Sequence, residues 1–208
     1  MNDRFAYDAS LLSDEELKNR VATREKYLPE TTEASVAELQ QRRHVFSDEE
    51  LDVIHQDLTA QRENAELSDK STGAFSQTYN NVVVEDLAAP QLYSRKAVYL
   101  FTFLFGALFG SIMLAINSSK TNNNKGVLLA LAFGVPVTIL QILVGVYIKV
   151  SASSYGFFWG LASAFIMDYL LWPRIIGTAT FYRTKPIWVP LVIGLAILAL
   201  LIIALVIG

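Results

Sequence analysis

Four long apolar stretches in the second half of the chain constrain its fold more strongly than any other feature. They cover residues 97–117, 127–148, 155–172 and 188–208. A helix crosses a bilayer core about 30 Å thick with about 20 apolar residues, because each residue adds about 1.5 Å. The third stretch is the weakest, since it contains Asp168 and ends at Pro173. The pattern predicts an all-α, polytopic membrane helical bundle of about four segments, in which each helix satisfies its own backbone hydrogen bonds.

Charge divides the chain into two unlike parts. Residues 1–94 hold nine Lys and Arg against nineteen Asp and Glu, a net charge of -10, whereas residues 95–208 hold eight basic residues against one acid, a net charge of +7. The whole chain is 52% apolar with a mean hydropathy of +0.34, which is too apolar for an ordinary soluble domain. We therefore predict an acidic helical head over residues 1–66, a linker and interfacial approach over residues 67–94, and a membrane domain over residues 95–208.

Two capping boxes mark helix starts in the head. Ser13 with Glu16 and Ser47 with Glu50 have the spacing at which the serine caps a backbone amide and the glutamate returns to the cap. Pro29 opens a helix between them, because proline is tolerated in a first helical turn. The predicted helices run from about residue 13 to 27, from 29 to about 43, and from 48 to about 66. Their apolar positions predict a small helical core containing Leu17, Val21, Leu28, Val36, Leu39, Leu51, Ile54, Leu58 and Ala65.

The orientation in the membrane depends on which segments cross. The first twenty residues are acidic and lack a secretory signal, so we expect a cytoplasmic head and four crossings. That topology leaves three basic residues inside and five outside, against the positive-inside tendency. The ratio becomes six to two if the third segment does not cross, and seven to one, with only Lys149 outside, if the first segment is re-entrant and bent at its glycines. A head outside gives five to three but requires the export of 94 polar residues.

Several strings of residues resemble a family of uncharacterised bacterial multi-pass membrane proteins. Three strings lie at the opening of the membrane domain: residues 92–99 (LYSRKAVY), 105–110 (FGALFG) and 114–117 (LAIN). Two more lie in the third segment and in the basic loop that leads into the fourth: residues 168–171 (DYLL) and 182–191 (YRTKPIWVPL). The N-terminal residues 13–17, 27–30 and 38–42 are similar to a short helical hairpin of related bacterial chains. The family carries no assigned activity. The resemblance implies a four-segment membrane architecture in the bacterial inner membrane and no reaction.

Asp168 is the only acid after Asp86, and Arg174 follows it closely in the chain. A carboxylate at mid-bilayer costs about 2.5–3.5 kcal/mol on insertion scales, and such residues often mark proton or cation paths. The alternative is structural, because Asp168 lies near the end of its segment and can pair with Arg174 or with another basic loop residue. We name Asp168 and Arg174 as a candidate intramembrane polar site.

Glycine and proline positions indicate how the segments pack. Gly106 and Gly110 form a GxxxG pattern, which allows close helix approach within the bundle or, alternatively, in a homo-oligomer. Pro136 is expected to kink the second segment. The membrane-flanking basic residues are candidate lipid headgroup contacts: Arg95, Lys96, Arg183 and Lys185.

The residue inventory excludes several chemistries. The chain has no cysteine, and its two histidines, His44 and His55, belong to no closely spaced ligand set. Nucleophile, phosphate-loop and dinucleotide motifs are absent from the sequence, and the acidic head disfavours nucleic acid. We expect no catalytic site, metal or cofactor, and a non-enzymatic adaptor or assembly subunit with a protein partner on its acidic head. The alternative is a small oligomeric transporter or channel that uses Asp168.

Overall fold

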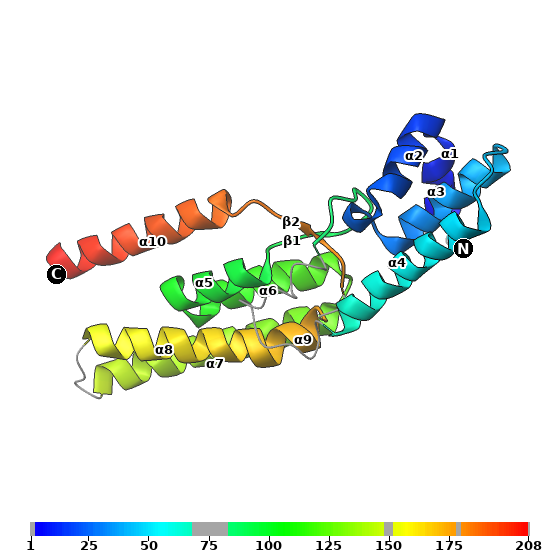
Figure 1. Ribbon diagram of the computed structural model, residues 1–208. Helices are drawn as coiled ribbons and strands as arrows, with labels where there is room; N and C mark the ends of the chain where they lie inside the picture. Colours follow the sequence, from blue (N-terminus) through cyan, green and yellow to red (C-terminus); the bar gives the residue numbers. More distant parts are fainter. Residues whose placement is uncertain (1–2, 68–82, 148–151, 178–179, 208) are drawn as a thin grey trace. The chain divides into compact units, whose positions relative to one another are not determined.

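A computed structural model describes residues 3–67, 83–147, 152–177 and 180–207, which are mostly helical (Figure 1). The chain divides into two compact units. The described part of the first, here called the head unit, is residues 3–67, 83–90 and 180–183. The described part of the second, here called the body unit, is residues 91–147, 152–177 and 184–207.

The head unit is built from helices whose starts are encoded locally. It contains α1 (Asp3–Ser10), α2 (Asp14–Ala22), the 3-10 turn η1 (Arg24–Lys26), α3 (Pro29–Gln41) and α4 (Asp48–Leu67). Both predicted capping boxes are confirmed: the backbone N–H of Ser13 donates to Glu16 at 2.9 Å, and that of Ser47 donates to Glu50 at 2.8 Å. Helix α1, with its short polar sequence, was not predicted.

Glu16 shows what such a cap does to a charge. The backbone and hydroxyl hydrogen bonds from Ser13 lower the pKa of Glu16 below its usual range. A folded-state pKa below the unfolded one means that the carboxylate stabilises the fold at neutral pH. This contribution is lost as the pH falls through the folded-state pKa.

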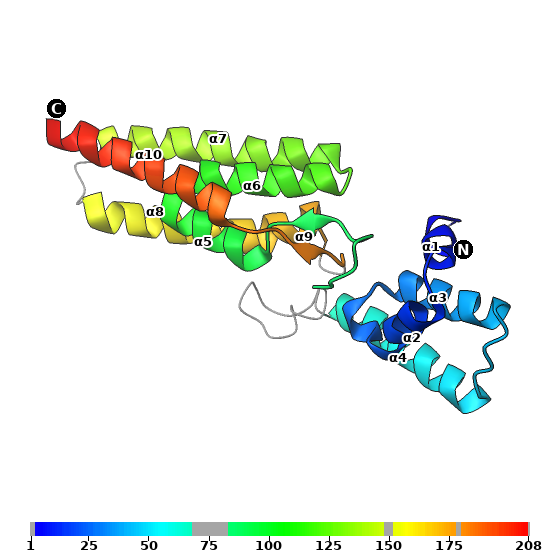
Figure 2. The same ribbon diagram turned by 90° about the horizontal axis from the view of Figure 1, so that it is seen from above.

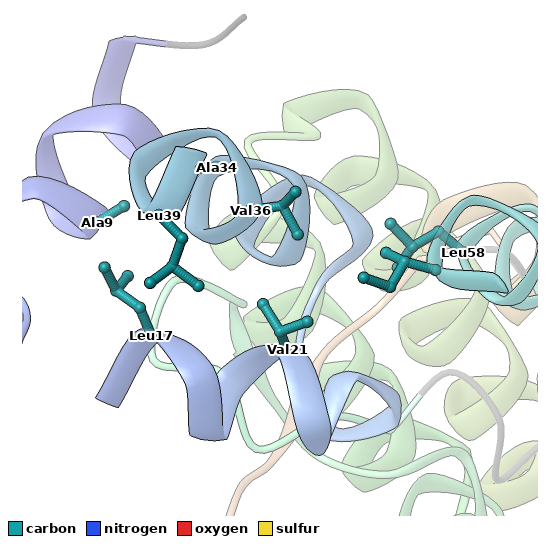
Figure 3. Close-up of a cluster of buried hydrophobic side chains, with 8 residues drawn as sticks. Ala9, Leu17, Val21, Ala34, Val36, Leu39 and Leu58 are labelled. Carbon is teal, nitrogen blue, oxygen red and sulfur yellow. The ribbon is translucent and has the colours of Figure 1, made fainter. Parts of the chain in front are cut away.

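The core of the head unit lies between α2, α3 and α4, with α1 closing one end. Figure 3 shows the buried side chains, which are Ala9, Leu17, Val21, Ala34, Val36, Leu39, Ile54 and Leu58. Most of them occupy the apolar positions predicted from periodicity. Arg42 joins three of the helices, because its guanidinium donates to the carbonyl oxygens of Ser10 and Leu12 and to the carboxylates of Asp14 and Glu38. The hydrogen bonds from Arg42 to Asp14 and Glu38 raise the pKa of Arg42 above its ordinary value.

Part of the predicted linker belongs to the head. Residues 68–82 lie outside the described residues, but Val83 forms a parallel bridge with Tyr182 and the N–H of Glu85 donates to the carbonyl of Lys26 at 2.8 Å. Asp86 is buried, and its carboxylate accepts a hydrogen bond from the backbone N–H of Leu28 at 3.2 Å. The head unit therefore includes residues 83–90, which the sequence placed in the linker.

The body unit contains five helices of two or more turns and a short extension. They are α5 (Arg95–Phe105), α6 (Ala107–Lys120), α7 (Asn124–Tyr147), α8 (Ala152–Ile166) with the π-helix η3 (Met167–Leu171) and α9 (Trp172–Ile175), and α10 (Trp188–Ile207). Strand β1 (Gln91–Leu92) pairs with β2 (Arg183–Thr184). Figure 1 shows three layers in this unit: α10, then α5 with α6, then α7 with α8 and α9. Between the last two layers, α6 packs on α7 and α5 packs on α8.

The first predicted segment, residues 97–117, is two antiparallel helices instead of one. Gly106 separates α5 from α6 with φ of 90° and ψ of 171°, a conformation that only glycine adopts readily. Tyr93 and Asn117 exchange two hydrogen bonds of 2.8 Å, although a continuous helix would hold them about 36 Å apart. The single-segment prediction is therefore wrong. The re-entrant alternative expected a bend at the glycines of this segment, and α5 and α6 are indeed separated by a bend at Gly106 (Figure 2).

The third predicted segment is longer than the sequence suggested. Helices α8, η3 and α9 follow one another without a break over 24 residues, so Pro173 does not end the segment. Pro173 lies in the first turn of α9, directly after the π-helix η3.

Helix α7 is the one described helix that is long and apolar enough, by length and composition, to cross a membrane. It has 24 residues, and Pro136 lies inside it without ending it. The most apolar 18 residues of α7 have a mean hydropathy of 2.5, and only 11% of them are buried in the protein.

Candidate functional site

Asp168 and Arg95 form a buried ion pair in the body unit. The Nε of Arg95 donates to Oδ1 of Asp168 at 2.5 Å, and Nη2 donates to the backbone carbonyl of Asp168 at 2.9 Å. The side chains are only 4% and 2% exposed. Asp168 therefore pairs with Arg95 and not with the predicted partner Arg174, which is exposed. The prediction that Arg95 contacts lipid headgroups is wrong, because its guanidinium is inside the unit.

Local structure explains how the two side chains reach each other. Ser94 caps α5 by accepting a hydrogen bond from Ala97 N at 3.1 Å, which places Arg95 in the first turn. A cation there opposes the helix dipole, so Asp168 compensates for an unfavourable position. Asp168 lies in the π-helix, where the N–H of Trp172 bonds to the carbonyl of Met167 five residues earlier. Such single π turns occur frequently at functional sites.

The energetics of this pair favour a structural role, in which it holds two helices together, over a role in transport. Each charge loses several kcal/mol of solvation on burial, and removing one partner alone costs about 3–5 kcal/mol. The pair therefore ties the start of α5 to the α8–α9 run. The sequence signal that could have identified Arg95 is that Asp168 is the only acid among eight basic residues after position 94. Sequence spacing alone does not choose among those eight.

Glycines mark where helices of the body unit cross closely. A Cβ on Gly110 would lie 1.8 Å from the Thr102 hydroxyl, across the α5–α6 hairpin, and one on Gly134 would lie 2.3 Å from the Ser111 hydroxyl. A Cβ on Gly160 of α8 would lie 2.6 Å from the carbonyl oxygen of Phe103 in α5. A Cβ on Gly106 would meet no atom within 4 Å, and this residue forms the turn between α5 and α6. Gly110 thus lies at a contact within the unit.

Hydrogen bonds connect several helix ends at one end of the body unit. The side chain of Asn123, in the turn between α6 and α7, donates to the carbonyl of Ile175 at the end of α9 at 2.8 Å. The N–H of Lys185 donates to the carbonyl of Leu92 at 2.7 Å, which brings the approach to α10 beside the approach to α5. This end therefore holds six basic residues of the unit: Arg95, Lys96, Lys120, Lys125, Arg174 and Lys185.

The remaining candidate headgroup contacts are partly exposed. Lys96 is partly exposed in the first turn of α5. Lys185 lies with Nζ 4.7 Å from the ring centroid of Tyr93. The guanidinium of Arg183 donates to the carbonyls of Leu87 and Ala89 at 3.4 and 3.3 Å within the head unit.

The head unit has a groove of about 410 Å³ between α2, α4 and the loop before α4. Apolar side chains form much of its lining, and charged side chains border it: Val21, Leu39, Phe46, Val53 and Ile54 with Lys18, Arg24, Glu49 and Glu50. Phe46 is oriented by an edge contact with His44, with ring centroids 4.7 Å apart. Sequence reasoning used Phe46 only as a helix-start residue and did not find the groove.

Metal chemistry has no support among the described residues, because no group of three or more His, Cys, Asp or Glu side chains could hold an ion there. His44 packs on Phe46 and His55 is exposed. Comparison with protein families, curated proteins and solved structures found no match.

Proposed function

We propose that this chain is a multi-pass membrane protein whose acidic head recruits a protein partner to the membrane surface, as a non-enzymatic adaptor or assembly subunit. The observation that carries the proposal is the division between an apolar helical body with exposed apolar faces and an acidic head that bears a groove. The body supplies the anchor, and the head supplies the binding surface.

Exposed apolar side chains support the anchor. Leu128, Ile142 and Val146 on α7 are 71%, 60% and 71% exposed, and Val192 and Leu200 on α10 are 59% and 67% exposed. Contiguous apolar surface of this extent marks membrane or protein contact, because water disfavours it. Neither helix has a charged residue between Gly126 and Tyr147 or between Trp188 and Gly208. Hydrocarbon is the solvent that suits these faces.

The hairpin supports one topology. With α5 and α6 returning to the side from which they start, the proposed crossings are α7, the α8–α9 run and α10. Seven basic residues then lie on the side of the head, including Arg183, and Lys149 alone lies opposite. This distribution agrees with the positive-inside tendency and supports a cytoplasmic head. The resemblance to bacterial multi-pass proteins makes the inner membrane the proposed location.

The head groove supports a partner of definite chemistry. Its lining is mostly apolar. Lys18 and Arg24 border it, and Arg24 is already paired with Asp57, whereas the first turn of α4 presents the exposed acids Asp48, Glu49 and Glu50. An amphipathic helix places its apolar face in such a groove while basic residues on its flanks meet the acids. We propose that the partner presents a basic amphipathic helix.

The test compares two valines of the head by affinity capture of the full-length protein with photo-crosslinking. Val53 lines the groove and is 52% exposed, whereas Val45 is 86% exposed and does not line it. We expect Val53→Asp to reduce crosslinked partner at least tenfold and Val45→Asp to leave it unchanged. Equal yields from both variants and the wild type would count against the head as the recruiting surface.

The alternative is a small transporter or channel that uses Asp168, and its support is the presence of a buried charged pair in an apolar unit. Arg95 binds both the carboxylate and the carbonyl of this residue, which leaves the adaptor as the better-supported function.

A further inference from the structure

A groove of about 260 Å³ lies between α6 and α10 in the body unit. Helix α6 contributes Phe109, Ile112, Met113 and Ile116, whose spacing places them on one helix face. An engineered apolar cavity of about 150 Å³ holds a benzene molecule, so this groove has room for a longer hydrocarbon segment.

Helix α10 forms the opposite wall. Its contribution runs from Val189 through Pro190 and Ile193 to Ile197, about 12 Å along the helix axis. Ile193 and Ile197 are 50% and 47% exposed, so the walls do not close on each other. The groove is a long apolar channel that follows the proposed crossing helix.

Tyr93 is the residue that brings polarity to this groove. It lines the groove, and the ammonium of Lys185 lies over its ring at 4.7 Å from the centroid. The sole acid of residues 95–208 is Asp168, which is already paired with Arg95, so the segment offers Lys185 no carboxylate of its own. The chain thus places a cation beside one end of a hydrocarbon-lined channel.

We propose that this groove binds one acyl chain of an anionic phospholipid, with the lipid phosphate on Lys185. An apolar tail with a negative head matches the order of these surfaces, because Lys185 and Tyr93 lie near the start of α10 and the apolar lining continues along α10 to Ile197. Basic residues near a bilayer surface attract anionic lipid, and Lys185 is the residue positioned to select one molecule at this site. The inference rests on the proposed membrane location and goes beyond it by assigning a specific ligand site.

The experiment measures phosphatidylglycerol retained by the full-length protein after detergent delipidation, using native mass spectrometry with phosphatidylcholine as the neutral comparison. Ile193→Trp fills the groove, and Val192→Trp is its control, because Val192 is 59% exposed on α10 and does not line it. We expect Ile193→Trp to abolish the bound phosphatidylglycerol and Val192→Trp to retain it.

The charge is tested separately. Lys185→Gln is expected to weaken phosphatidylglycerol binding about fivefold and to leave phosphatidylcholine unchanged. Lys125→Gln is its control, since Lys125 is exposed in the first turn of α7 and does not line the groove. Equal retention in Ile193→Trp and Val192→Trp, equal binding of the two lipids, or a changed oligomeric state without lipid loss would overturn the lipid site and leave the membrane proposal standing. A chain that is monodisperse in buffer without any amphiphile would overturn the membrane proposal itself.

Discussion

Arg95 and Asp168 are 73 residues apart in the chain, and each is the other's counterion inside the body unit. Neither residue would be stable there alone, because an isolated buried charge has no compensation for its lost hydration. The two side chains and the carbonyl of Asp168 together specify how α5 sits against the α8–α9 run.

This pair predicts strong non-additivity. Arg95→Met and Asp168→Leu should each lower the stability of the body by about 3–5 kcal/mol, because each leaves one buried charge unpaired. The double variant should recover most of that loss, since it buries neither charge. Thermal unfolding in detergent micelles measures all four proteins. Losses that simply add in the double variant would contradict the assignment of the pair.

Interactions between residues a few positions apart could be predicted from the sequence. Interactions between residues far apart in the chain could not. The capping boxes at Ser13 and Ser47 were predicted because donor and acceptor lie three residues apart. Arg95 was assigned to lipid headgroups because it flanks an apolar run, and nothing local shows that Asp168 lies beside it in the fold.

Among the helices, the α5–α6 hairpin is the element that hydropathy misrepresents. An apolar run of 21 residues is the same run whether it continues or folds back, and glycine is common in membrane helices. The bend is visible only in the backbone of Gly106 and in the Tyr93–Asn117 hydrogen bonds. The third segment differs from its prediction in the other direction. The sequence predicts that this segment ends at Pro173, whereas the helical run continues through Pro173 to Ile175.

The hairpin makes Gly106 a sensitive position. Its φ of 90° with extended ψ is nearly exclusive to glycine, so Gly106→Ala should cost about 1–3 kcal/mol, although the added methyl meets no neighbour. Gly156→Ala is the matched control, because Gly156 in α8 also has open space and no positive φ. The two variants are compared by thermal unfolding in the same micelles. A Gly156→Ala loss as large as that of Gly106→Ala would argue against a strained turn.

For the whole molecule, the proposed topology follows from the hairpin and from the positions of the basic residues. The division into an acidic and an apolar part was predicted from charge and hydropathy alone. The number of helices in the apolar part was not, because hydropathy does not show whether one run of residues is one helix or two.

Cysteine accessibility tests that topology directly, because the chain has no native cysteine. Single cysteines at Glu63, Lys120 and Thr184 should be labelled from the same face of the membrane in sealed vesicles, and one at Ser153 from the opposite face. Four crossings would instead put Lys120 and Thr184 opposite the head, with Ser153 on the head side. That labelling pattern would reject the re-entrant arrangement.

The hairpin also changes the shape that the body presents to lipid. Helices α5 and α6 have 11 and 14 residues, so they extend about 16 and 21 Å, which is short of the full bilayer core. In the proposed orientation they enlarge the protein cross-section mainly on the cytoplasmic side of the bilayer. We therefore expect a body of this taper to fit best in a bilayer whose cytoplasmic leaflet is convex.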